Sequence, residues 1–130
     1  MKIKVAKELM WMLPYIEESY KLLPQGTKIT RLGCWKGNNR YGKDVVASIF
    51  TNDDKNFRVY LHLYNSYNPS KVIKKYTKSM LIKTLAHELA HVIEMGKHTP
   101  QFRKLEKRLV RRFLQMSPKS NYSEFVSKKH

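Results

Sequence analysis

Residues 79–102 have the sequence SMLIKTLAHELAHVIEMGKHTPQF, and this stretch decides the fold. Its apolar residues recur every three to four positions, which predicts a buried helix from Ser79 to Gly96 that ends on a glycine suited to the left-handed conformation. His87 and His91 lie four residues apart, so both side chains project from one face of this helix, one turn apart. That spacing lets two imidazole nitrogens reach a single Zn²⁺ ion.

Glu88 directly follows the first of these histidines and is rotated by about 100° around the helix axis. A carboxylate in that position can hold a metal-bound water and accept its proton without becoming a ligand itself. His98 comes just after the predicted helix end, and we predict it as the third ligand, with Glu94 and Glu106 as alternatives. Three protein ligands plus a water are typical of a catalytic zinc site.

The residues before this helix predict a helical segment followed by strands. Apolar residues at helical spacing favour a helix from Ile3 to Leu23, kinked or split at Pro14. Alternating and β-branched patterns then predict three strands in a small antiparallel sheet, at residues 27–35, 45–50 and 57–64.

The residues after His98 predict a last, strongly basic helix. Thr99 and Pro100 suit the N-cap and the first helical position, and the helix should run to about Gln115. One stripe is apolar, with Phe102, Leu105, Leu109 and Phe113. The other side is either a solvated surface or a nucleic-acid contact, for which we select Arg103, Lys107, Arg108, Arg111 and Arg112.

Length and composition indicate one small domain with a basic surface. The chain has 130 residues, 26 Lys and Arg against 10 Asp and Glu, and a formal net charge of +16. Such a charge attracts polyanions, so DNA is an expected partner, single-stranded or duplex. We expect a domain over residues 1–118 and a loosely ordered basic tail over residues 119–130.

Localisation is expected to be cytoplasmic, or nuclear or nucleoid-associated, and the chain is expected to be a monomer without a membrane partner. Cys34 is the only cysteine, which favours a reducing compartment. No stretch of the sequence has the pattern of a signal peptide or of a transmembrane helix.

The run from His87 to Phe102 resembles the zinc-peptidase segment of SprT-like, WLM and YgjP-like proteins. In that segment His-Glu-x-x-His is followed by a third histidine, here His98, and by an aromatic residue four positions later. The resemblance spans about residues 80–113, and the six residues between His91 and His98 leave the subfamily open.

The resemblance implies an α+β, zincin-like minimal metallopeptidase with an N-terminal helix, a small antiparallel sheet, the His-Glu-x-x-His helix and a basic C-terminal helix. The implied activity is that of a zinc metalloendopeptidase that acts on proteins bound or crosslinked to DNA, as in DNA–protein crosslink repair. In such enzymes an edge strand beside the cleft pairs with extended substrate, and residues 57–64 are our candidate for that strand.

Two other functions remain open. A zinc-dependent endoribonuclease of the YbeY type also uses three histidines, but its motif resembles His-Gly-x-x-x-His, so Glu88 argues against it. The other is a nucleic-acid-binding module with an inactive metal site.

Overall fold

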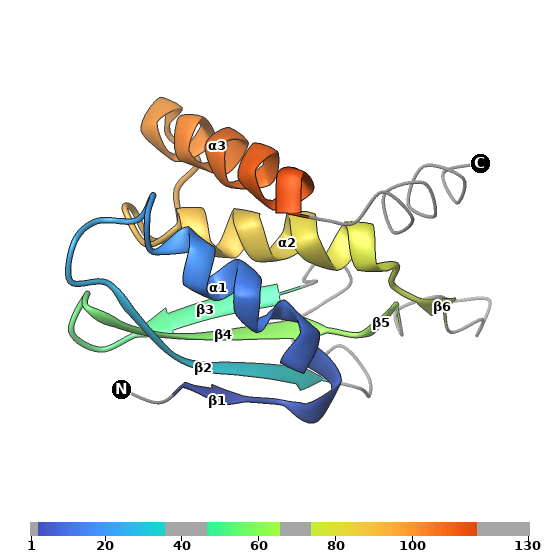
Figure 1. Cartoon of the computed structure of the whole chain (residues 1–130). Coiled ribbons are helices and arrows are strands. Elements are labelled where there is room, and N and C mark those ends of the chain that lie inside the picture. The colour runs from blue at the N-terminus through green and yellow to red at the C-terminus, as the bar shows by residue number, and fades with distance from the viewer. Residues whose placement is uncertain (1–2, 36–46, 66–73, 117–130) are drawn as a thin grey trace.

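The computed structural model describes residues 3–35, 47–65 and 74–116 as an α+β domain (Figure 1). Helices α1, α2 and α3 lie on one side of a four-stranded sheet. This arrangement confirms the predicted fold class and the predicted order of helix, strands, ligand helix and basic helix. No helix in the described ranges is long and apolar enough to cross a membrane. The tail predicted at residues 119–130 lies outside the described residues.

The N-terminal segment is divided into three short elements. Strand β1 is Lys4–Val5, a 3₁₀ helix (η1) is Lys7–Met12, and α1 is Leu13–Ser19. Pro14 stands in the first turn of α1, where a missing backbone N–H costs no hydrogen bond, so the predicted split at this proline is confirmed. The two residues of β1 were predicted as helix, because so short a strand has no periodicity of its own.

The main sheet is mixed, with strand order β1-β2-β4-β3. Strand β2 is Lys28–Trp35, β3 is Ala47–Thr51 and β4 is Asn56–His62. Only the hairpin of β3 and β4 is antiparallel, whereas β2 pairs in parallel with both β1 and β4. Among the three predicted strands, the antiparallel pairing is therefore confirmed for β3 with β4 and wrong for β2 with β4. After β2 the chain first forms β3, which occupies the edge of the sheet beyond β4. Strand β4 then lies between β2 and β3 and runs in the same direction as β2.

Strand β4 lies inside the sheet, between β2 and β3. The prediction that residues 57–64 form an edge strand was therefore wrong, and β3 and β1 occupy the edges. A strand that buries one face alternates apolar and polar residues wherever it stands in the sheet, so its pattern does not report its neighbours.

Two long helices follow a small second sheet. Strands β5 (Tyr64–Asn65) and β6 (Lys74–Lys75) pair antiparallel and lead into α2, which spans Lys78–Ala90. Helix α3 spans Pro100–Met116.

The core lies between the sheet and the helices. From β4 it takes Phe57, Val59 and Leu61, and the predicted apolar stripe of α3 is buried in full: Phe102, Leu105, Leu109 and Phe113. Tyr15 of α1 meets Phe113 edge to face, with 5.4 Å between ring centroids. Helix α2 is therefore held on one side by the sheet and on another by α3, which fixes the position of its histidines.

Candidate metal centre

Helix α2 anchors the first part of the site. The Thr77 hydroxyl caps its start by accepting a hydrogen bond from the Met80 backbone N–H at 3.2 Å. Its core side is buried through five residues that carry no charge: Leu81, Ile82, Leu85, Ala86 and Leu89. Because these residues fix the rotation of the helix, the position of His87 in its last turn is fixed as well.

The helix ends sooner than predicted. Its last residue is Ala90, and His91 is its C-cap. From there the backbone continues in a tighter turn, in which N–H groups reach back three residues, as from His91 to Glu88 and from Glu94 to His91. Gly96 then adopts a φ of +76°, the left-handed conformation expected for it. This turn brings the chain back so that His98 approaches α2.

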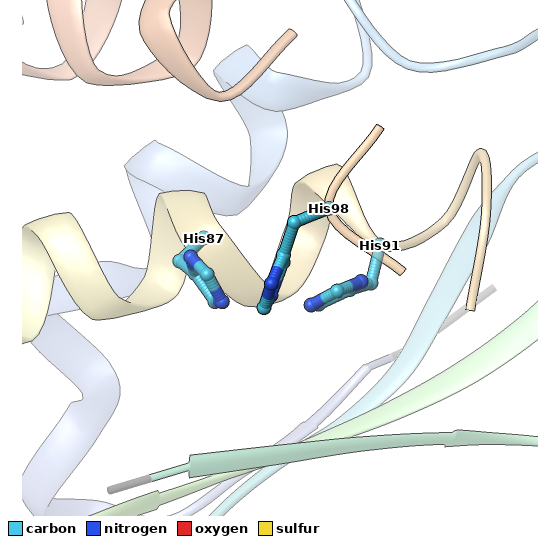
Figure 2. Close-up of side chains that lie close together, drawn as sticks. All are labelled: His87, His91 and His98. Atoms are coloured by element: carbon cyan, nitrogen blue, oxygen red, sulfur yellow. The ribbon is translucent and has the colours of Figure 1, made fainter. Parts of the chain in front are cut away.

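The structure brings together His87, His91 and His98 (Figure 2). Each pair of rings has its centroids 5.0 Å apart, so the three rings form an equilateral triangle. Each histidine offers a ring nitrogen, and these three nitrogens lie within 4.8 Å of one another. In Figure 2 the three rings point to the same side of the α2 ribbon.

These distances fit a bound metal ion. A ring centroid lies roughly 3.2 Å from a metal held by Nε2, and tetrahedral angles then separate the centroids by roughly 5.2 Å. The observed 5.0 Å agrees with that value for all three pairs. The three histidines could therefore hold a metal ion.

Hydrogen bonds at Nδ1 orient two of the rings. His87 Nδ1 lies 2.7 Å from Glu106 Oε2, and His91 Nδ1 lies 3.2 Å from the Glu94 carbonyl oxygen. Both contacts leave Nε2 free for a metal and match the usual outer partners of ligating histidines. Glu106 and Glu94, the alternatives for third ligand, are thus partners of two other histidines, Glu94 through its backbone.

His91 and Glu88 are largely buried, with exposed fractions of 7% and 8%. Burial lowers the pKa of His91, and this favours the neutral imidazole that binds metal. Burial also raises the pKa of Glu88, against a smaller opposite effect of His87. A carboxyl with a raised pKa is suited to exchanging a proton near neutral pH.

Phe102 packs against all three rings of the histidine triangle. Its ring centroid lies 5.0 Å from that of His87, 4.4 Å from that of His91 and 4.9 Å from that of His98. The residue is fully buried in the first turn of α3, whose start is capped by Thr99. Sequence reasoning placed Phe102 in the core but gave it no part in the site, although the aromatic position four residues after His98 was the available signal.

The predicted nucleic-acid residues all belong to α3. All five are exposed: Arg103, Lys107, Arg108, Arg111 and Arg112. Arg112 donates through Nε to Glu18 Oε2 of α1 at 3.2 Å, and Glu18 also binds Lys21. Arg108, Arg111 and Arg112 line a pocket of about 320 Å³ together with Leu22 and Gln115.

Comparison with known proteins gives little further identification. No protein-family model matches the chain, and no curated protein matches it. One solved structure is similar, the crystal structure of Wss1 from Saccharomyces cerevisiae, with 20% sequence identity over 86% of each chain and a TM-score of 0.49.

Proposed function

We propose that this protein is a zinc metallopeptidase that hydrolyses peptide bonds in proteins bound to nucleic acid. The observation that carries the proposal is the triangle of His87, His91 and His98 beside the buried carboxylate of Glu88. Three imidazoles with a water as fourth ligand form the open site of a catalytic zinc, and a carboxylate next to the first ligand matches the arrangement for a general base.

Glu88 would accept a proton from the attacking water and return it to the leaving amine nitrogen. Bound zinc would supply Lewis acidity, which lowers the pKa of a water and polarises the scissile carbonyl. Glu106 would hold the His87 ring in the tautomer that leaves Nε2 free, and the Glu94 carbonyl would do so for His91.

Strand β3 replaces β4 as our candidate for holding extended substrate. It stands at the edge of the main sheet and packs against α2, the helix that carries Glu88. An edge strand can add a substrate strand through its unpaired backbone groups. The exposed basic residues of α3 would contact the nucleic acid that carries the substrate protein.

The test is Glu88→Gln, which keeps the size of the side chain but removes the base. Zinc content should stay at the level of the unaltered protein, whereas cleavage of casein, with and without single-stranded DNA, should fall to background. His98→Ala should lose zinc and activity together. Retained cleavage in Glu88→Gln would contradict the proposed mechanism. RNA cleavage without proteolysis would favour the endoribonuclease instead.

A further inference from the structure

The main sheet has a second face, turned away from the helices. Along β4, Phe57, Val59 and Leu61 are buried against the helices, so Arg58 and Tyr60 between them point to the opposite side. Figure 1 shows α1, α2 and α3 together on one side of this sheet. The other face therefore presents its own set of side chains.

Three cations lie in one row across that face. The strand register pairs Lys4 of β1 with Arg31 of β2, Arg31 with Arg58 of β4, and Arg58 with Phe50 of β3. All three cations are exposed. Neighbouring strands are about 4.8 Å apart, so the backbone positions of the three cations span about 10 Å.

The three positive charges of this row repel one another when no ligand is bound. Like charges on directly opposite residues of neighbouring strands destabilise a sheet. Strands β1 to β4 contain no Asp or Glu that could compensate the repulsion. A bound polyanion would remove the repulsion, which makes the row complementary to a phosphate backbone.

Two aromatic rings stand beside the row. Phe50 and Tyr60 are partly exposed and meet at 5.8 Å between centroids, and the Arg58 guanidinium lies 6.0 Å from the centre of the Phe50 ring. Gly33 faces Tyr60 across the β2–β4 ladder, and a Cβ atom there would lie 2.7 Å from Tyr60 Cδ1 and Cε1. The glycine thus allows the Tyr60 ring to pack directly on β2.

We propose that this face binds single-stranded nucleic acid, with phosphates on Lys4, Arg31 and Arg58 and bases stacked on Phe50 and Tyr60. Aromatic rings interleaved with cations suit an unpaired strand, because the base faces of a duplex are already stacked within the helix. The site is separate from α3 and from the histidine triangle. This inference rests on the proposed function only for the reason why the protein would hold nucleic acid. The binding itself can be measured without any peptidase assay.

The test measures binding of a fluorescent oligothymidine to the full chain by anisotropy at several salt concentrations. Replacing both Arg31 and Arg58 by Ala should weaken binding at least tenfold and reduce the slope of log K against log salt by about 1.4, or about 0.7 for each lost phosphate contact. Phe50→Leu should weaken binding roughly tenfold with the salt slope unchanged, because it removes stacking without removing charge.

The matched control removes two exposed cations that lie outside the sheet, Lys7 of η1 and Lys21 just after α1, and should leave affinity within twofold. An equal loss in this control would show that only net charge matters and would overturn the proposal. So would duplex DNA bound as tightly as the single strand, or a loss confined to Arg108→Ala/Arg111→Ala on α3. The thermal midpoint and the zinc content of each variant are measured first. If replacing both arginines by Ala lowers either of them, Arg31→Gln/Arg58→Gln takes the place of that variant. A chain that binds oligothymidine through this face but cleaves no protein would refute the peptidase and leave this inference standing.

Discussion

The contact between His87 and Glu106 predicts how strongly the protein should hold its metal. Glu106→Gln keeps the shape of the side chain and one oxygen acceptor but removes the negative charge that lies 2.7 Å from His87 Nδ1. Loss of such an outer partner typically weakens metal affinity 10- to 100-fold. The two side chains are 35% and 24% exposed, so solvent screens part of the effect. We therefore expect the lower part of that range, about 10- to 30-fold, or about 1.4–2 kcal/mol.

The assay is a competition titration of zinc against a chromophoric chelator, with the apo protein refilled in steps. Glu94→Gln is the matched control, since it makes the same chemical change at a residue that also contacts a histidine of the site. Glu94 serves His91 through its backbone carbonyl, and its carboxylate lies 3.9 Å from Lys97. Its replacement should leave zinc affinity unchanged.

Two outcomes would refute this reasoning. Unchanged affinity in Glu106→Gln would mean that the carboxylate does not support His87. A loss as complete as that of His87→Ala would mean that Glu106 is itself a ligand, the alternative that the sequence left open.

Three further predictions concern stability and can be measured by denaturant or thermal unfolding of the apo protein. Phe102→Ala should cost about 3–5 kcal/mol, because it empties a fully buried ring position under the histidines; a cost below 1 kcal/mol would contradict that packing. The pKa of Asp53 is lowered to about 2 by hydrogen bonds from the hairpin after it, so its contribution to stability is full above about pH 4 and is lost as pH falls through about 2. Asp53→Asn should flatten the pH dependence of the unfolding midpoint in that interval, and a curve identical to that of the unaltered protein would count against the assignment. Gly33→Ala should cost about 1–3 kcal/mol, since the new methyl group meets the Tyr60 ring; in a Tyr60→Ala background the same change should cost nothing measurable, and an undiminished cost there would place the strain elsewhere.

The parts of the site that were predictable from sequence are local in the chain. His87, Glu88 and His91 belong to one helical repeat, and the geometry of that repeat is the same in every protein. His98 required only that the chain turn back after the helix, which Gly96 indicated. The apolar stripe of α3 followed from the same periodicity.

The prediction for the end of α2 was wrong by six residues, since the helix stops at Ala90 rather than near Gly96. Apolar residues continue at similar spacing through the turn that follows the helix. The three-residue hydrogen-bonding repeat of that turn differs little from the repeat of an α-helix. Periodicity alone does not separate the two.

The errors in the sheet have a different origin. The alternation in β4 correctly indicated one buried face, but the choice of neighbours depends on how the chain crosses over, and that is a long-range property. The contacts of Glu106 and of Phe102 with His87 are equally long-range. They join α2 to α3 and exist only once the two helices have packed.

The contacts of Phe102 couple the position of the three histidine rings to the position of helix α3. The ring lies at the first turn of α3, a rod of 17 residues and therefore about 25 Å long, while Arg112 ties the other end of that rod to Glu18 of α1. A rotation of only about 5° around Arg112 displaces Phe102, which lies ten residues and therefore about 15 Å away, by roughly 1.3 Å, more than half the length of a zinc–nitrogen bond. We therefore expect a substitution at the α1–α3 contact, such as Glu18→Ala, to change the affinity for metal although it touches none of the three histidines.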